Sequence, residues 1–472
     1  MRDPARRHWL QAAGTLGALA TLAPWPVAAQ TPGPAMRVAA LADEVAAGRR
    51  SALAVVEQAL ARAQAGNGEG PRCFSAVHAD QARATARAID GWRRAGRPLP
   101  PLAGVPVAVQ DVLDEAGQRT QGSSAAAQHD APSVRRLREA GLVLLGRTRG
   151  TDLAWPGLGL LAQGDTPRNR FERETGRVPG GGAAGAAIAV ADGLVAAAIG
   201  NDAGGGLRVP AALNGLVGWK PTARRVPRDG MLPLAPTLDS IGVLAHSVDD
   251  CALLDGVLAG TAPGLAAGPL LRGLRVAVPT TLVQEGLAPE VAHAFQIAVA
   301  RLAAAGVQVV ELALPAFAQA ASTDAAQLLA AEAHVAHRAR LAGGQLDARV
   351  AAALQAGAAT NDKQLAQLLA RRDAFTAAVA GAASGFDALV WPSTQDTAPT
   401  LAQAAADGQG ALRERALRNA ALVNLFDGCA LTLPCHAPGK APVGLTLAGL
   451  AGSDARVLGV GRSVAALLAS PA

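Results

Sequence analysis

The sequence predicts an α/β fold with a central mixed β-sheet covered by helices on both sides. Segments rich in alanine, leucine and arginine with helical spacing alternate with short runs of apolar or β-branched residues that have the length of strands. This alternation is typical of layered α/β domains, in which helices cover buried strands. With 472 residues, half of them hydrophobic, the chain is also long enough to bury a large core.

The expected elements follow one another along the whole chain. Helices are expected at residues 53–64, 80–94, 291–304 and 364–380, and strands at residues 105–109, 142–145, 194–199, 274–278, 307–310, 388–390 and 444–447. The stretch 259–271 is rich in glycine, alanine and proline, so it is the expected linker or lobe boundary.

Residues 1–29 are expected to be an export signal of the twin-arginine type, followed by one domain over residues 30–472. The signal has Arg6 and Arg7, then a weakly apolar stretch at 12–22, and ends in small residues at 27–29. The apolar stretch is too short to span a bilayer, so no membrane span is expected after the signal is removed. The protein is therefore predicted to be periplasmic or secreted.

The charge balance argues against a nucleic-acid partner. The formal net charge is +6, and loss of residues 1–29, which hold three arginines and one aspartate, lowers it to +4. The cations are dispersed arginines, and no basic block alternates with aromatic residues. We therefore expect no nucleic-acid binding.

Neither a disulfide framework nor a metal site is expected. The four cysteines form no C-x-x-C pair: Cys73, Cys251, Cys429 and Cys435. A bridge from Cys429 to Cys435 is one alternative, but buried free thiols are favoured. His334 and His337 have the spacing of one helix face, yet no further ligand accompanies them, so they are expected to be solvated helix residues. No metal or cofactor is expected.

Two glycine triplets, at 180–182 and 204–206, flank a run of small apolar residues. The run is not a membrane span, because Asp192 and Gly193 interrupt it. A helix at 183–191 followed by a buried strand at 194–199 fits better.

One alternative for this segment is a dinucleotide site. Gly180, Gly182 and Gly185 match the G-x-G-x-x-G pattern, and Asp202 follows the next expected strand at a suitable distance. That motif requires a strand before its first glycine. The preceding residues, 174–179, are polar and end in a proline, so the dinucleotide hypothesis is the less favoured one.

Residues 179–221 resemble the signature region of the amidase signature family. The family loop Pro-Gly-Gly-Ser-Ser-Gly-Gly-Ser corresponds to PGGGAAGA at 179–186, and its Gly-Thr-Asp-x-Gly-Gly-Ser-x-Arg-x-Pro-Ala to GNDAGGGLRVPA at 200–211. Further landmarks follow the family order at 104–111, 215–222, 238–242, 247–250, 387–394 and 424–445. The resemblance covers roughly residues 38–468 and implies one large α/β domain, as in the glutamyl-tRNA amidotransferase A-subunit type.

The resemblance also implies an activity, namely hydrolysis or transfer of the acyl group of amides by a Ser, cis-Ser, Lys relay. In this sequence the lysine position is Gln110, the cis-serine position is Gly182 and the nucleophile position is Gly206. A glutamine amide is not a useful base, and glycine has no side-chain oxygen. No residue is therefore a confident catalytic residue, and the interpretation leans towards a protein without catalysis.

A rebuilt relay is the alternative. The nearest hydroxyls in the sequence, with conceivable bases and orienting acids, are Ser123, Ser124, Thr237, Ser240, His129, His246, Asp202 and Asp239. Such a relay would make the protein an active amidohydrolase that cleaves a carboxamide C–N bond with displaced catalytic residues.

The backbone of the second glycine triplet remains as a candidate binding feature. By the resemblance, the N–H groups of Ala203, Gly204, Gly205 and Gly206, together with Asp202, form an oxyanion-hole-like site. Backbone amides without a nucleophile bind anions or carbonyl oxygens. The favoured hypothesis is an exported pseudo-amidase that binds a small amide or carboxylate, or acts as a partner subunit.

Overall fold

The computed structural model describes residues 36–162, 165–264, 267–320, 322–344, 346–407 and 410–470. They belong to one compact unit, Gly33–Ala472. The predicted export signal at residues 1–29 lies outside the described residues and stays a prediction.

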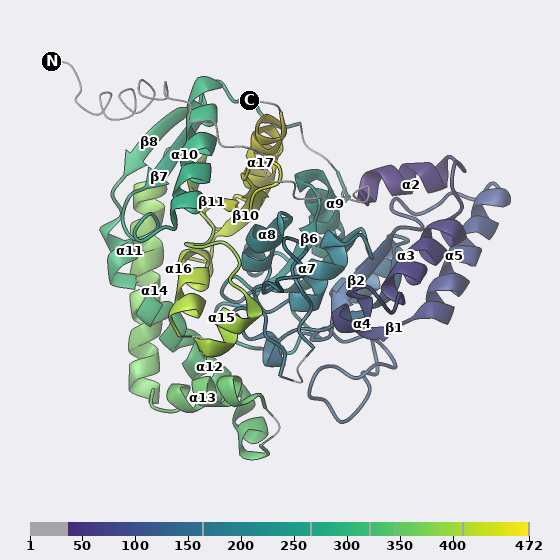
Figure 1. Ribbon diagram of the computed structural model, residues 1–472, viewed down its shortest axis with the longest axis horizontal. Coiled ribbons are helices and arrows are strands. Elements are labelled where there is room, and N and C mark those ends of the chain that lie inside the picture. The colour runs from purple at the N-terminus through teal and green to yellow at the C-terminus, as the bar shows by residue number, and fades with distance from the viewer. Residues whose placement is uncertain are drawn as a thin grey trace. The chain divides into compact units, whose positions relative to one another are not determined.

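An 11-stranded mixed sheet runs through this unit (Figure 1). In spatial order its strands are β1 (Phe74–Val77), β3 (Val143–Thr148), β2 (Pro106–Gln110), β4 (Ala197–Asn201), β6 (Ile241–Ala245), β5 (Val217–Lys220), β10 (Cys429–Pro434), β11 (Gly444–Gly449), β9 (Ala388–Pro392), β7 (Arg275–Pro279) and β8 (Gln308–Leu312). Strand β2 pairs in parallel with β3 and β4, and β7 pairs in parallel with β8 and β9. The pairs between β4 and β9 are antiparallel, so the sheet is mixed, as expected.

Each face of the sheet packs against its own hydrophobic core. Along β9, Ala388 and Val390 belong to one core, whereas Leu389 and Trp391 belong to the other, because successive strand residues point to opposite faces. Helices therefore cover both sides of the sheet, which confirms the predicted fold class.

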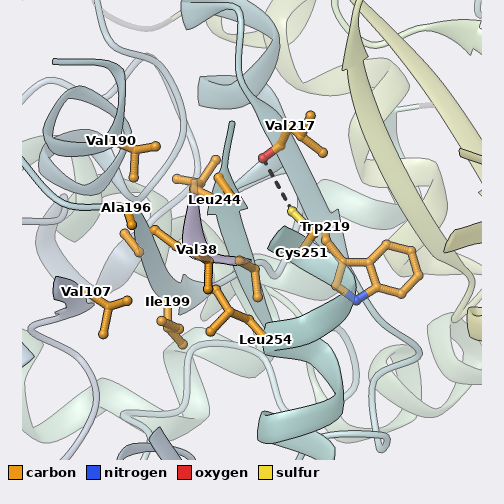
Figure 2. Close-up of a cluster of buried hydrophobic side chains, with 14 of the residues drawn as sticks. Val38, Val107, Val190, Ala196, Ile199, Val217, Trp219, Leu244, Cys251 and Leu254 are labelled. Atoms are coloured by element: carbon orange, nitrogen blue, oxygen red, sulfur yellow. Dashed lines mark hydrogen bonds between the residues drawn. The ribbon is translucent and has the colours of Figure 1, made fainter. Parts of the chain in front are cut away.

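The larger core contains buried residues of α2 (Val38–Ala46), α3 (Ala52–Ala63), α5 (Ala79–Arg94), α6 (Pro132–Glu139), α7 (Ala184–Ala191), α9 (Val248–Ala259), α10 (Pro289–Ala304) and α17 (Asp454–Ala469). The second core contains buried residues of α11 (Pro315–Ala320), α12 (Ser322–Ala342), α13 (Ala348–Gly357), α14 (Asp362–Ala383) and α16 (Ala411–Leu425). The remaining short helices are α4 (Gly70–Cys73), the 3₁₀ turn η1 (Asp152–Ala154), α8 (Arg208–Asn214) and α15 (Leu401–Ala406). Figure 2 shows part of the larger core, where Leu244 and Trp219 of the sheet pack near Leu254 of α9.

The helices and strands expected from the sequence are all present, with ends displaced by a few residues. The run of small apolar residues forms helix α7 and strand β4, and all eight residues of α7 are buried. The stretch 259–271 lies between α9 and β7 inside one unit. The expected lobe boundary is therefore wrong, because both neighbouring elements contribute to the same core.

The four cysteines are free thiols, so Cys429 and Cys435 are not bridged and the favoured alternative is confirmed. Burial raises the pKa of each of these two thiols to about 12, so both stay protonated and unreactive at neutral pH. Within the described ranges, no helix combines the length and the apolar character that a membrane crossing requires.

Candidate functional site

The two glycine triplets lie side by side in the fold. The carbonyl oxygen of Gly206 accepts hydrogen bonds from the backbone N–H groups of Gly182 and Ala183, at 3.2 Å each. A Cβ atom on Gly181 would lie 2.5 Å from the same oxygen, and Gly181 has a φ of +68°. Glycine is required at this crossing, because any side chain would separate the two segments.

The three positions that the resemblance assigns to a relay also come together. Gln110, at the end of β2, is fully buried, and its Nε2 donates to Gly182 O at 3.2 Å. Its Oε1 accepts from the backbone N–H of Asn201, at the end of β4, at 3.0 Å. The side chain of Gln110 thus joins the two glycine segments by hydrogen bonds, and the group supplies neither a nucleophile nor a base.

Backbone atoms fill the space where hydroxyl-bearing side chains would stand. A Cβ atom on Gly182 would lie 2.3 Å from Ala154 O, and one on Gly206 would lie 2.5 Å from Asn201 O. Real Cβ atoms do not approach backbone this closely, so a serine at either position requires the chain to move. We call Gln110, Thr151, Ala154, Gly182 and Gly206 the site floor.

The segment that closes the site floor has an unusual backbone. Leu153 and Ala154 have φ values of +58° and +54°, in the left-handed region that non-glycine residues rarely adopt. The side chain of Gln121 supports this turn, since its Oε1 accepts from Leu153 N at 2.6 Å and its Nε2 donates to Thr151 O at 3.1 Å. Such strain persists only where surrounding contacts support it.

Thr151 is a buried hydroxyl of the site floor that the sequence patterns do not reveal. Its Oγ1 donates to Trp155 O at 2.8 Å and lies 3.4 Å from Gly182 O. Among the described residues, no carboxylate, imidazole or amine is hydrogen-bonded to this hydroxyl. Thr151 therefore lacks a base and is no nucleophile in this arrangement. No local motif marks it, because only the folded chain places it beside Gly182.

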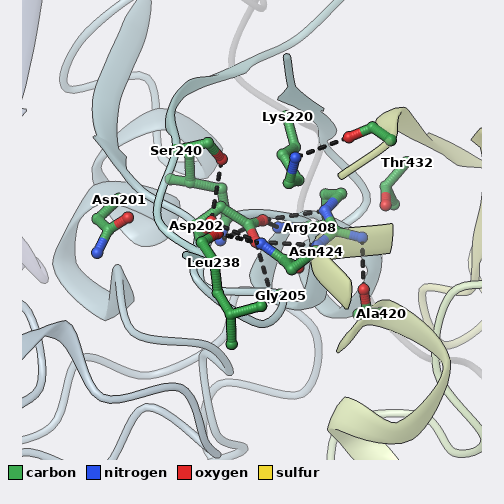
Figure 3. Close-up of polar contacts among 12 residues, drawn as sticks. Asn201, Asp202, Gly205, Arg208, Lys220, Leu238, Ser240, Ala420, Asn424 and Thr432 are labelled. Atoms are coloured by element: carbon green, nitrogen blue, oxygen red, sulfur yellow. Dashed lines mark hydrogen bonds and ion pairs between the residues drawn. The ribbon is translucent and has the colours of Figure 1, made fainter. Parts of the chain in front are cut away.

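The loop after β4 is anchored from beneath by a buried ion pair (Figure 3). Asp202 and Arg208 are both fully buried and their side chains are 2.9 Å apart. The carboxylate of Asp202 also accepts from the backbone N–H groups of Gly205 at 2.8 Å and Leu207 at 3.2 Å. Burial alone would raise the pKa of Asp202, but the charge and hydrogen bonds of Arg208 outweigh it and hold the pKa well below its usual range. Asp202 thus holds the loop in shape and does not line the cavity described below.

Three of the four predicted amide donors remain available. The N–H of Gly205 is bonded to Asp202, whereas those of Ala203, Gly204 and Gly206 have no acceptor among the described residues. Buried backbone N–H groups without an acceptor are rare and costly. Ala203 and Gly204 also line the cavity described below, whereas Gly206 does not.

A cavity of about 450 Å³ opens above this loop, between helices α12 and α16. Ala203 and Gly204 form part of its wall. The remaining lining residues are Pro156, Leu238, Ala320, Ala325, Ala326, Leu329, Gly410, Arg413, Glu414, Leu417, Arg418, Ala421 and Leu422. The volume lies within the range of pockets that bind small molecules, and most of the lining is apolar.

The residues proposed for a rebuilt relay do not assemble into one. Ser123, Ser124 and His129 are exposed. Ser240 Oγ donates to Asp202 O at 3.0 Å, and the imidazole of His246 donates to Val190 O at 2.9 Å. Burial lowers the pKa of His246, and no hydroxyl among the described residues is hydrogen-bonded to its imidazole.

Asp239 is also buried, and its carboxylate holds neighbouring loop residues in place by hydrogen bonds. It accepts from Asn201 Nδ2 at 3.0 Å and from the backbone N–H groups of Leu234 and Ala235. Burial raises its pKa to about 6, because these hydrogen bonds only partly offset the loss of water.

Thr237 is the one member of that set with a carboxylate partner. Its hydroxyl is hydrogen-bonded to Glu332 Oε1, and its backbone N–H donates to Glu332 Oε2 at 2.9 Å. Thr237 is not among the residues that line the cavity, although its neighbour Leu238 is.

The buried lysine nearest to this region is Lys220. Its Nζ donates to Pro221 O at 2.9 Å and to Gly428 O at 2.7 Å, and it is fully buried. Burial lowers its pKa to about 8. Because both contacts are backbone carbonyls of residues outside the site floor, Lys220 supports the end of β5.

The metal and dinucleotide hypotheses gain no support. No group of three potential metal ligands occurs among the described residues. His337 is only 3% exposed and its imidazole donates to Pro233 O at 2.6 Å, while His334 donates to Leu354 O at 3.1 Å. The expectation of a solvated side chain is therefore wrong for His337, which packing of α12 buries against Pro233, whereas His334 is half-buried.

The dinucleotide alternative is contradicted by the fold. Residues 168–180 contain no strand, so the β-strand that must precede the glycines is missing. Asp202, which would bind a ribose, is committed to Arg208.

Comparison with known proteins gives consistent results. A family model described as Amidase matches residues 54–458. The 2-amino-5-chloromuconic acid deaminase of Comamonas testosteroni is 34% identical over 400 residues, which cover 82% of this chain and 87% of the relative. The A-subunit of the glutamyl-tRNA(Gln) amidotransferase of Roseiflexus sp. (strain RS-1) is 38% identical over 246 residues, 48% of this chain. The match spans 50% of that relative.

Solved structures agree over nearly the whole chain. A crystal structure of an amidase superimposes with a TM-score of 0.82 and 30% identity, covering 91% of this chain and 99% of the other. The native peptide amidase from Stenotrophomonas maltophilia superimposes with a TM-score of 0.75 and 26% identity, covering 93% of this chain and 97% of the other.

Proposed function

Because this chain belongs to the amidase family, we propose that it retains an acyl-binding site without a catalytic relay and binds a small carboxylate or amide. The observation that carries this proposal is that the site has groups suited to binding but lacks groups suited to catalysis. Ala203 and Gly204, whose N–H groups have no acceptor among the described residues, line a cavity, while the side chains at Gln110, Gly182 and Gly206 offer no nucleophile and no base.

The size of the catalytic loss supports a binding role. A serine relay acts as a unit, and an enzyme that lacks one member keeps only about 10³- to 10⁴-fold acceleration over water, from its oxyanion hole and binding alone. The donors for an oxyanion remain here, so binding of a carbonyl or carboxylate oxygen is the function that these groups can still perform.

The names of the relatives support the ligand class. One relative is named for a deaminase of a carboxylic acid, and others for amidases or an amidotransferase component. Carboxylates and carboxamides are both planar groups with an acceptor oxygen on the central carbon. Backbone N–H donors can bind that oxygen in either group. A role as a partner subunit is a variant of this proposal, since one relative is a subunit by name.

A second candidate function is an amidohydrolase with displaced residues. The hydrogen bond between Thr237 and Glu332 favours it, because it joins a hydroxyl to a carboxylate that could take its proton. The pair also joins a loop to helix α12, which is a sufficient structural role.

Turnover of simple aryl amides and labelling by a fluorophosphonate, followed by mass spectrometry, test the proposal on the purified protein. We expect no turnover above the rate of the uncatalysed reaction and no labelled serine or threonine. Turnover that Thr237→Val abolishes would establish the second candidate. Turnover that survives in Thr237→Val would overturn the proposal as well, and the labelled residue would identify the nucleophile.

We also propose that the protein is exported, on the basis of Arg6, Arg7 and the apolar stretch that follows them. Cell fractionation of the full chain tests this. The Arg6→Lys, Arg7→Lys double variant is expected to remain in the cytoplasm, whereas the natural chain reaches the periplasm. Retention of both chains in the cytoplasm contradicts export.

A further inference from the structure

Two arginines of helix α16 line the cavity, and neither forms an ion pair within 4.0 Å among the described residues, although the charges of Glu285 and Glu414 act on Arg418. Arg413 Nε donates to Pro156 O at 3.2 Å, and its guanidinium lies 5.9 Å from the centre of the Trp155 ring. Arg418 donates to Leu282 O at 2.8 Å and to Glu285 O at 2.6 Å, while its buried Nε has no partner. Among the described residues, neither guanidinium lies within 4.0 Å of a carboxylate oxygen.

Arg415, on the same helix, differs from Arg413 because it has an ion-pair partner. Its guanidinium forms a two-pronged contact with the carboxylate of Asp396. Arg415 does not line the cavity. The unpaired state of Arg413 is therefore a property of the cavity and not of the helix.

Arg413 is a cation in surroundings that stabilise it poorly. Burial lowers its pKa to about 10, so it keeps its charge at neutral pH. Glu414 also lines the cavity, and its charge acts on Arg418, whereas no acidic residue contributes to the pKa shift of Arg413. With two cations and one acid, the cavity carries a net positive charge. A partly desolvated guanidinium without a counter-charge favours an anion, and its planar donors match a carboxylate best.

The rest of the cavity is apolar. Leu329 of α12 and Leu417 and Leu422 of α16 contribute to its wall, together with several alanines. A ligand that fills this space must therefore carry an apolar body in addition to its anionic group.

We infer that the cavity binds a monocarboxylate with an apolar body, and that Arg413 binds its carboxylate while the leucines of α12 and α16 contact the body. This inference rests on the proposed function, because the ligand occupies the cavity that Ala203 and Gly204 line. It goes further by naming the ligand class and the residue that selects it.

Calorimetric titration of the whole protein with octanoate and with its neutral analogue octanamide tests the inference. The Arg413→Gln variant is expected to lose octanoate affinity by roughly 10- to 100-fold, the usual consequence of losing a hydrogen bond to a charged group. Its affinity for octanamide should fall by less, because a neutral carboxamide loses a hydrogen bond but no ionic attraction. The Arg413→Lys variant should recover part of the loss, since it keeps the charge but not the planar donors. Arg415→Gln is the matched control on the same helix and should bind octanoate like the natural protein.

The outcomes separate this inference from the proposed function. If octanoate binds Arg413→Gln as tightly as the natural protein, or does not bind the natural protein at all, the inference is overturned. Binding of octanamide alone overturns it while the proposed function stands. Hydrolysis of octanamide by the natural protein overturns the proposed function, and the effect of Arg413→Gln on octanoate still decides the inference. Circular dichroism and the melting temperature of Arg413→Gln, compared with those of the natural protein, show whether the variant is folded.

Discussion

The site floor is filled by backbone atoms, whereas the cavity above it is open. In the site floor, backbone atoms of Ala154 and Asn201 occupy the positions that Cβ atoms on Gly182 and Gly206 would need. In the cavity, about 450 Å³ stays open beside Gly204, and a Cβ atom there would meet its nearest neighbour at 3.5 Å. The difference shows that backbone closes the space around positions 182 and 206, whereas the space beside Gly204 is open, so the two regions respond differently to an added side chain.

This comparison changes what a reversal of the substitutions is expected to achieve. Returning serine to positions 182 and 206 and lysine to position 110 would restore the atoms of a relay, but two of the three new side chains would collide with backbone. The lysine would also enter a fully buried position without a carboxylate partner. The turn at Leu153 and Ala154 must move before such a relay could form.

We expect the largest effect on stability from breaking the buried ion pair between Asp202 and Arg208, which lies beneath the loop after β4. Asp202→Ala leaves Arg208 charged, fully buried and without its partner, which should cost about 3–5 kcal/mol in the free energy of unfolding. Urea denaturation measures it. Asp324→Ala is the control, because the Arg371 side chain of that pair is 51% exposed and the loss should stay below about 1 kcal/mol. Equal losses in the two variants would contradict the assignment.

Acid titration should reveal the second largest effect. The pKa of Asp239 is raised from 3.8 to about 6, so the folded protein keeps a proton that the unfolded chain releases between these values. Its contribution to stability therefore falls by about 3 kcal/mol as the pH rises from about 4 to about 6, and stays constant above that.

The Asp239→Asn variant isolates this contribution, because an amide does not titrate. The difference in unfolding free energy between the natural protein and the variant should change across that pH window, in favour of the natural protein at the acid end. Parallel stability curves would show that Asp239 titrates normally. Asp202, which Arg208 keeps ionised, has the opposite sign and loses its contribution only at lower pH.

A matched pair of glycines compares the two regions directly. Gly182→Ala places a Cβ atom against Ala154 O and should cost about 1–3 kcal/mol, the usual range for overpacking. Gly204→Ala meets only ordinary contact with Pro156, and its effect should stay within about 0.5 kcal/mol. Thermal or urea unfolding of both variants measures this. If Gly182→Ala is as stable as Gly204→Ala, the site floor is not closed by backbone.

Much of the fold was predictable from local patterns. Helix α7 and strand β4 follow from a run of small apolar residues that Asp192 and Gly193 divide. The wrong expectation for His337 has a clear cause: helical spacing does not show which face of α12 packs against the loop that contains Pro233. The role of Asp202 was missed for a similar reason, since its partner Arg208 is visible in the sequence but the burial of the pair is not.

The sequence by itself determined the α/β class, the order of the elements and the absence of a nucleophile or base in the side chains at positions 110, 182 and 206. Periodicity and residue identity are local properties, so they can be read without the fold. Only the tertiary structure decided that backbone closes the site floor and that, in the part of the chain that the structure describes, the amides of Ala203 and Gly204 have no acceptor and Arg413 lines the same cavity without an ion pair. The physical reason is that steric overlap, hydrogen bonding and ion pairing depend on distances of a few ångströms between atoms. Those distances are set when segments far apart in the chain pack together.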